Sequence, residues 1–176
     1  NASANSWGPR NELAYLQRFG SFQSQAVVVL LNTDDLFAIA PNSVQVGRDR
    51  NYPDRRPLLA WIELFQRYVL PAPALPELET LQQEGGDRVG YNLAAIEQMH
   101  AMLSQEKIPL AIVMTPLLRE VGEPGPKDYE LKARKRLLEL TQSQNIPYLD
   151  ILPLFNAYSS PQTLYLDTIH LTPEGN

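Results

Sequence analysis

The chain has 176 residues, of which 44% are hydrophobic and 20% charged, and its formal net charge is −5. This composition is typical of one soluble globular domain, and the acidic balance without a basic run argues against a nucleic-acid surface. The absence of cysteine excludes disulfides, thiol catalysis and cysteine-ligated metal. The two histidines have no metal-ligand spacing, and no apolar stretch is long enough to span a bilayer.

The predicted elements begin with a helix over residues 9–19, which stops at Gly20. The β-branched and aliphatic run over residues 25–31 is typical of a buried parallel strand. A second helix is expected over residues 57–69, with its apolar face in the core. That face consists of Trp61, Leu64, Phe65 and Tyr68.

The second half of the chain continues the alternation of strand and helix. The spacing predicts a helix over residues 91–106, a strand over 109–114, a long helix over 127–144 and a strand over 147–152. This order implies right-handed crossovers and a parallel sheet with helices on both faces. The basic residues of the long helix are expected on a solvated face; they are Lys132, Arg134, Lys135 and Arg136.

Two stretches interrupt this scaffold as insertion loops, residues 36–56 and residues 70–90. Long irregular insertions in a compact domain are usually functional lids or disordered segments. The first contains arginines interleaved with acidic residues, which indicates a solvated face, and binding of an anionic substrate group is the alternative. The residues concerned are Arg48, Asp49, Arg50, Asp54, Arg55 and Arg56.

Asp167 and His170 form the most informative spacing in the chain, on a turn that follows the third predicted strand. In parallel sheets ligands bind at the carboxyl ends of the strands, so the loops after Leu31, after Met114 and around Asp167 are the expected sites of chemistry. A carboxylate at this spacing can hold the imidazole in one tautomer and leave the other ring nitrogen to accept a proton from a nucleophile.

Three further titratable residues are given structural interpretations. His100 lies in the middle of a predicted helix and is interpreted as a structural or solvated histidine. Asp35 is expected to cap the turn after the first strand through its side chain. Asp150 on the third strand is expected to be a hydrogen-bonding residue rather than a catalyst.

The run Asp167-Thr168-Ile169-His170 resembles the last signature block of the SGNH hydrolases, also called the GDSL lipase/esterase family. Residues 1–9 resemble the second block of that family, residues 27–35 resemble the third, and residues 146–165 resemble the approach to its Asp-x-x-His turn. The resemblance runs from Asn1 to Asn176. It implies a three-layer α/β/α fold with a flavodoxin-like parallel sheet.

Several roles follow from the resemblance. Asp167 would orient His170, which would act first as general base and then as general acid. Ser6 takes the place of the glycine whose backbone N–H serves the oxyanion hole. Asp34 stands at the position of an asparagine that donates to the oxyanion, but an ionised Asp34 only accepts. Either a buried setting keeps Asp34 protonated, or Asn32 replaces it as donor, or the site is weakened.

The first block of the family, Gly-Asp-Ser with the nucleophile, does not occur in this chain. In the family fold it follows a first strand, which would precede Asn1, and a last helix would follow Gly175. We therefore expect residues 1–176 to form a single SGNH-like domain, a fragment without these two elements. An N-terminal segment is expected to supply the strand and the serine, and without it the neighbouring strands have unpaired edges.

The resemblance implies hydrolysis of an acyl or acetyl ester, on a lipid or a carbohydrate, through an acyl-serine intermediate and without metal or cofactor. The same scaffold carries O-acetyltransferases. A non-catalytic binding module is the alternative from another class, and Asp34 and the absent serine favour it. A nucleotide binder is the weakest alternative, because no glycine-rich phosphate loop follows a strand. The sequence leaves the compartment and the oligomeric state open.

Overall fold

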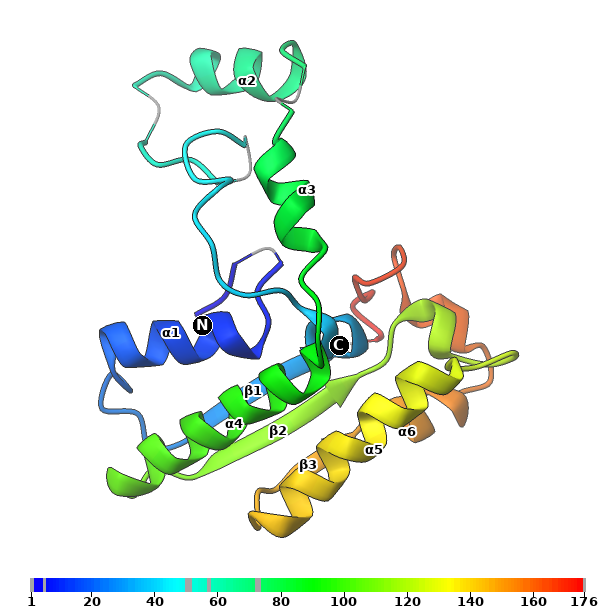
Figure 1. Ribbon diagram of the computed structural model, residues 1–176. Helices are drawn as coiled ribbons and strands as arrows, with labels where there is room; N and C mark the ends of the chain where they lie inside the picture. Colours follow the sequence, from blue (N-terminus) through cyan, green and yellow to red (C-terminus); the bar gives the residue numbers. More distant parts are fainter. Residues whose placement is uncertain (1, 5, 50–51, 57, 72–73, 176) are drawn as a thin grey trace.

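The computed structural model describes residues 2–4, 6–49, 52–56, 58–71 and 74–175. Its centre is a three-stranded parallel sheet with the strand order β1-β2-β3 (Figure 1). The α/β class with a parallel sheet is therefore confirmed. The expectation of unpaired edges on both strands beside a missing central strand is wrong, because the first two strands pair directly with each other from Val27↔Leu110 to Asn32↔Thr115. The strands are β1 (Val27–Asn32), β2 (Leu110–Thr115) and β3 (Tyr148–Asp150).

The helices begin and end within three residues of the predicted bounds wherever one was predicted. Residues 70–90 were predicted to be irregular, which is wrong, because they contain α3 and the start of α4. Among the described residues no helix is both long and apolar enough to cross a membrane. The helices are α1 (Pro9–Phe19), α2 (Ala60–Tyr68), α3 (Pro76–Gln82), α4 (Arg88–Gln105), α5 (Asp128–Ser143) and α6 (Leu152–Asn156), and the 3-10 turns are η1 (Thr33–Phe37), η2 (Leu118–Glu120) and η3 (Pro161–Leu164).

The helices that matter for the core start at recognisable caps. α1 begins with Pro9, whose missing N–H is harmless at a first helical position. α4 is capped by Asp87, whose side chain accepts a hydrogen bond from the backbone N–H of Gly90 at 3.0 Å. At the start of α5 the capping carboxylate comes from inside the helix, where Glu130 accepts a hydrogen bond from the backbone N–H of Lys127 at 2.7 Å.

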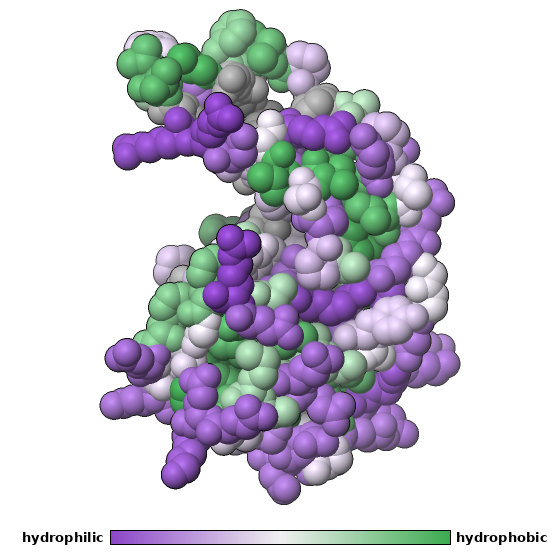
Figure 2. Space-filling model, turned by 60° about the vertical axis from the view of Figure 1, so that its left-hand side comes forward, coloured by the Kyte–Doolittle hydropathy of each residue, from purple (hydrophilic) through white to green (hydrophobic). Residues whose placement is uncertain are grey.

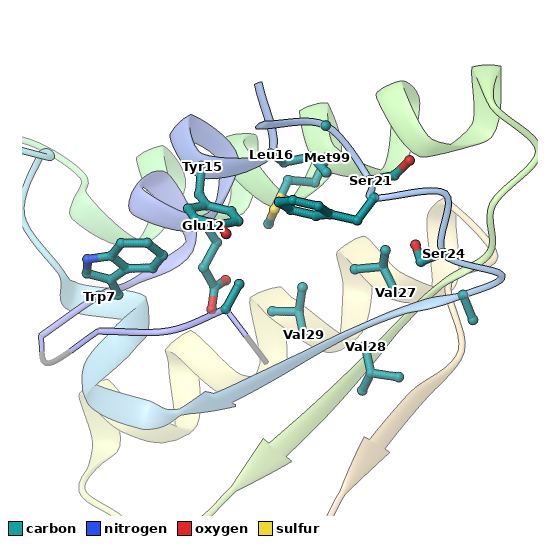
Figure 3. Close-up of a pocket in the computed structure, with 14 residues that line it drawn as sticks. Trp7, Glu12, Tyr15, Leu16, Ser21, Ser24, Val27, Val28, Val29 and Met99 are labelled. Carbon is teal, nitrogen blue, oxygen red and sulfur yellow. The ribbon is translucent and has the colours of Figure 1, made fainter. Parts of the chain in front are cut away.

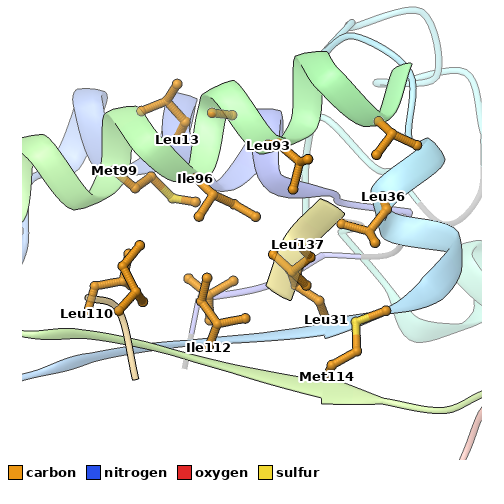
Figure 4. Packing of buried hydrophobic residues seen from close by; sticks show 14 of the residues in the cluster. Leu13, Leu31, Leu36, Leu93, Ile96, Met99, Leu110, Ile112, Met114 and Leu137 are labelled. Atoms are coloured by element: carbon orange, nitrogen blue, oxygen red, sulfur yellow. The ribbon is translucent and has the colours of Figure 1, made fainter. Parts of the chain in front are cut away.

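The hydrophobic core lies between one face of the sheet and the helices α1, α4 and α5 (Figure 4). Leu31 and Ile112 on the sheet meet Ile96 of α4 and Leu137 of α5, and each of the four is at most 1% exposed. Full burial of such a side chain contributes about 1.5–3 kcal/mol to the free energy of unfolding. This packing fixes the strands, and hence the positions of the loops that follow them.

Helices lie on both sides of the sheet, but they cover it unequally (Figure 1). Val28 and Leu30 of β1 point away from the core and are 61% and 62% exposed. Leu30 is in register with Val113, which is in register with Leu149, also exposed. The second face therefore presents a row of aliphatic side chains, and β1 is at the same time an edge strand.

The helix over residues 60–68 does not pack on the sheet as predicted. It lies on an arm, residues 39–86, that projects away from the sheet (Figure 1). The prediction that its apolar face belongs to the core is wrong, because that face is exposed to solvent. The residues concerned are Trp61, Leu64, Phe65 and Tyr68, which are 78%, 51%, 52% and 79% exposed.

Candidate functional site

The carboxyl ends of the three strands form a rim on which the predicted site segments lie. β1 runs directly into η1, which carries Asn32 and Asp34 at its start. The chain that follows β3 and α6 reaches Asp167 and His170. The segment after β2 lies between these two groups and contacts both, as the following hydrogen bonds show.

Asp167 and His170 are hydrogen-bonded through their side chains, with Nδ1 of His170 2.7 Å from Oδ2 of Asp167. Oδ1 of Asp167 accepts from the backbone N–H groups of Ile169 and His170, each at 2.8 Å. The bond from the backbone of His170, with the other two, lowers the pKa of Asp167 to about 2. Because a carboxylate only accepts, Nδ1 carries the proton and Nε2 of the neutral ring is a free acceptor.

The turn that carries this pair is anchored by the segment after β2. An antiparallel bridge joins Tyr165 to Leu171 and closes the turn. The buried phenol of Tyr165 donates to the carbonyl of Pro116 at 2.7 Å, and the N–H of Leu118 donates to the carbonyl of Thr168 at 3.1 Å. The backbone of the turn is thus held, while the acid and imidazole side chains are 54% and 75% exposed.

The start of η1 is fixed by a reciprocal cap. The side-chain oxygen of Asn32 accepts from the N–H of Asp34 at 2.8 Å, and the Asp35 carboxylate accepts from the N–H of Asn32 at 2.8 Å. The structural role predicted for Asp35 is confirmed, and burial raises its pKa to about 6. The cap uses only the oxygen of the Asn32 amide, so its Nδ2 group is not engaged in it.

Asp34 is ion-paired rather than buried. Its Oδ1 lies 2.6 Å from Nη2 of Arg119, which also lies 2.8 Å from Oε1 of the buried Glu130. The side chain of Asp34 is 58% exposed, so the buried setting considered for a protonated Asp34 is wrong. Two of the three alternatives remain, Asn32 as the donor in place of Asp34 and a weakened site.

Ser6 adopts a left-handed backbone with φ of 60°, a conformation that glycine tolerates better than serine. Two residues later, Gly8 packs tightly against the end of η1. A Cβ at Gly8 would lie 2.4 Å from Cβ of Ala38 and 3.0 Å from the carbonyl oxygen of Asp35. The segment before α1 therefore lies against the turn that follows β1.

A buried ionic network beneath the rim was not predicted from the sequence. Oε1 of Glu120 accepts from the Thr33 hydroxyl at 2.6 Å, and Oε2 lies 3.2 Å from Nη2 of Arg134. Arg134 also makes a paired contact with Asp150 at 2.8 and 2.9 Å, which confirms the hydrogen-bonding role of Asp150. The expectation that Arg134 lies on a solvated face is wrong, because its side chain is only 6% exposed.

This network joins the two halves of the rim. Glu120 also accepts from the N–H of Leu117 at 2.7 Å, in the segment that anchors the Asp167/His170 turn. Thr33, its partner on the other side, is the first residue of η1. The sequence signal that points to Glu120 is its place just after the second strand, one of the three loops expected to carry chemistry.

A cavity of about 560 Å³ lies between α1 and the outer edge of β1 (Figure 3). Its walls include Trp7, Tyr15, Val27 and Val29, and Glu12 reaches into it from α1. Burial raises the pKa of Glu12 to about 7, with the charge of the nearby Asp35 as a smaller cause. Among the described residues, Oε2 of Glu12 is buried without a hydrogen-bond partner.

The described residues contain no group of three or more His, Asp or Glu side chains arranged to hold a metal ion. A comparison with models of protein families finds no match to the chain, and a comparison with curated protein sequences finds none either.

Proposed function

We propose that this domain belongs to a serine hydrolase that cleaves an acyl or acetyl ester, with Asp167 and His170 as its orienting carboxylate and general base. The observation that carries the proposal is the 2.7 Å bond between Nδ1 of His170 and Oδ2 of Asp167. In a neutral ring this bond selects the tautomer that a hydroxyl nucleophile requires, with Nε2 as the proton acceptor of an exposed side chain.

The charge that develops on the substrate carbonyl needs donors on the same rim. The backbone N–H of Ser6 and the Nδ2 group of Asn32 are the donors that we propose. Asp34, held by Arg119, cannot take this role, because its carboxylate only accepts. One such donor typically lowers the barrier by roughly 3–4 kcal/mol.

The nucleophilic serine is proposed to arrive on a further strand at the outer edge of β1. Two features support this position. β1 is an edge strand, and its outer edge borders the cavity that Val27 and Val29 line. An unpaired strand edge beside an apolar cavity is suited to accept another strand, whose side chains would fill the cavity.

A fluorophosphonate probe tests this proposal, because it labels only serines activated by a base. We expect the full-length protein to be labelled and to hydrolyse p-nitrophenyl acetate, and the His170→Ala variant to lose both properties. Arg18→Gln, a change of an exposed residue on α1, should keep both. Equal labelling of the wild-type and His170→Ala proteins would remove His170 from the mechanism.

A second candidate is a non-catalytic binding module on the same scaffold. The ion pair between Asp34 and Arg119 favours it, because a carboxylate then occupies the place of an oxyanion donor. This candidate predicts no labelling of any serine in the full-length protein. It also predicts that Asp34→Asn, which restores an amide, leaves the protein inactive, whereas a weakened hydrolase should gain activity from that change.

A further inference from the structure

The arm formed by the described residues within 39–86 ends in an apolar tip, which we define as the described residues within 48–70. In α2 and the turn before it, the large hydrophobic side chains are turned to solvent rather than into the protein. Four of them recur at helical spacing and lie on one side of the helix. They are Leu58, Trp61, Phe65 and Tyr68, which are 92%, 78%, 52% and 79% exposed.

The apolar face of α2 is wide. Ile62 and Leu64, on its two flanks, are 42% and 51% exposed, and Val69 just beyond the helix is exposed too; Glu63 lies on the other side. A wide apolar face needs an apolar surrounding, which α2 does not find within the described residues. Exposed apolar surface of this extent marks an interaction site.

The tip is also basic, in contrast to the rest of the chain. Residues 48–70 contain five arginines and three acidic residues, within a chain whose net charge is −5. Arg55 and Arg56 lie just before α2 and are exposed, although Arg55 also lies 3.7 Å from Asp54. Figure 2 shows hydrophobic side chains gathered at the end of the arm, with hydrophilic side chains beside them.

The base of the arm is clamped to the domain. Arg10 of α1 makes a paired contact with Glu84 at 2.9 and 2.7 Å, where the arm returns to the sheet. Glu84 also accepts from the N–H of Ala40, where the arm leaves it. Asn92 of α4 donates to the carbonyl of Ala38 at 2.9 Å.

We propose that the tip of the arm docks on the surface of a membrane that contains anionic phospholipids. Tryptophan and tyrosine favour the boundary between headgroups and acyl chains, and a short apolar helix can lie in that plane. The arginines beside it pair with lipid phosphate, which explains why the tip is basic within an acidic protein. The proposal goes beyond the esterase proposal and does not depend on it.

Co-sedimentation of the full chain with vesicles tests the docking. We expect binding to vesicles of phosphatidylglycerol and phosphatidylcholine in equal parts, and weak binding to pure phosphatidylcholine. Trp61→Ala should reduce the partition coefficient by roughly tenfold, because a large aromatic surface leaves the interface. Arg55→Gln and Arg56→Gln should each reduce it by roughly fivefold, and salt should have the same effect.

Matched controls lie outside the arm. Phe22→Ala removes an aromatic side chain that is 66% exposed, and Arg18→Gln removes an exposed arginine on α1. Both variants should bind vesicles like the wild-type protein. A reduction as large as that of Trp61→Ala would show that binding is not made by the tip and would overturn the proposal.

Tryptophan fluorescence gives an independent readout. In a Trp7→Phe background, Trp61 is the only tryptophan, and its emission should shift to the blue with the anionic vesicles. No shift and no co-sedimentation would overturn the proposal. A dimer in solution that Trp61→Ala dissociates, without any vesicle binding, would instead make a second copy of the chain the occupant of the tip. Neither readout involves ester hydrolysis, so a failure here leaves the proposed reaction untouched.

Discussion

Two side-chain pairs at the rim, each with one carboxylate, are built in opposite ways. Glu120 and Arg134 are 0% and 6% exposed, and their pair ties the segment after β2 to α5. Asp167 and His170 are 54% and 75% exposed, and their pair ties only one turn to itself. A buried pair is expensive to break, because each charge left behind has lost its water, whereas an exposed pair contributes little to stability.

The comparison separates a charged pair that stabilises the fold from a pair whose geometry is defined without a large contribution to stability. The buried pair serves the fold, since it keeps the ends of β1, β2 and β3 in fixed register around one arginine. The exposed pair has no such purpose, yet three hydrogen bonds define the position of Asp167. A defined geometry that does little for stability is what a reaction site requires.

The largest expected effect is on the buried pair. Glu120→Ala removes one of the two carboxylates that pair with the buried Arg134 and leaves the Thr33 hydroxyl and the Leu117 N–H without their acceptor, and it should lower the free energy of unfolding by about 3–5 kcal/mol. Urea denaturation followed by circular dichroism measures the change. The control is Arg136→Ala on the same helix, which breaks a pair with Asp87 whose side chains are 41% and 57% exposed and should have a much smaller effect. Similar losses in the two variants would break the comparison between buried and exposed pairs.

The next effect concerns Glu12, a largely buried carboxyl for which no ion pair is found among the described residues. Its pKa in the folded protein, about 7, lies above the ordinary value of 4.5. The folded state therefore holds the proton more tightly, and stability is greatest below pH 4.5 and falls as the pH rises toward 7. The full loss is on the order of 3 kcal/mol.

Urea denaturation at a series of pH values between these limits measures the slope. Glu12→Gln keeps the shape of the side chain without the ionisation, so its stability should change less with pH than that of the wild-type protein. The pH dependence of stability that remains in Glu12→Gln is expected from Asp35, whose pKa is also raised by burial. A Glu12→Gln variant with the wild-type slope would show that Glu12 does not titrate in this range.

Much of the scaffold could be predicted because its signals are local. Apolar runs placed β1 and β2, helical periodicity placed α1, α4 and α5, and side-chain chemistry marked Asp35 as a cap. The Asp167/His170 contact could also be predicted, because a spacing of three residues on a turn nearly determines it. These predictions depend on residues that are neighbours in the chain.

The predictions that were wrong or absent concern residues whose surroundings come from distant parts of the chain. Periodicity shows that α2 has an apolar face but not what that face contacts, so its exposure on the arm was missed. Arg134 was placed in solvent because its partner Glu120 lies 14 residues away on a different segment. For the same reason Arg119, the partner of Asp34 at a separation of 85 residues, was not recognised.

A smaller effect is expected at Ser6, whose backbone is left-handed at φ 60°. Ser6→Gly removes the contact between Cβ and the following carbonyl, and it should raise the free energy of unfolding by up to about 1 kcal/mol. Urea denaturation measures the gain, and Ser3→Gly, outside this conformation, is the control. An equal or lower stability for Ser6→Gly would mean that serine is not strained at this place on the rim.

The smallest effect on stability is expected at Asp167, and it gives the sharpest form of the comparison. The folded state lowers the pKa of this carboxyl to about 2, so its contribution is present above the ordinary value of 3.8 and is lost as the pH falls through 2. Asp167→Asn should therefore leave the denaturation midpoint at neutral pH nearly unchanged, because the group is exposed.

The tautomer of His170 should nevertheless change in Asp167→Asn, since the amide no longer requires a proton on Nδ1. Long-range proton–nitrogen NMR of the ring measures this change. Under the proposed mechanism the same substitution should lower the rate of ester hydrolysis by roughly 10⁴-fold. A variant that is much less stable but equally active would mean that this pair, like Glu120 and Arg134, serves the fold.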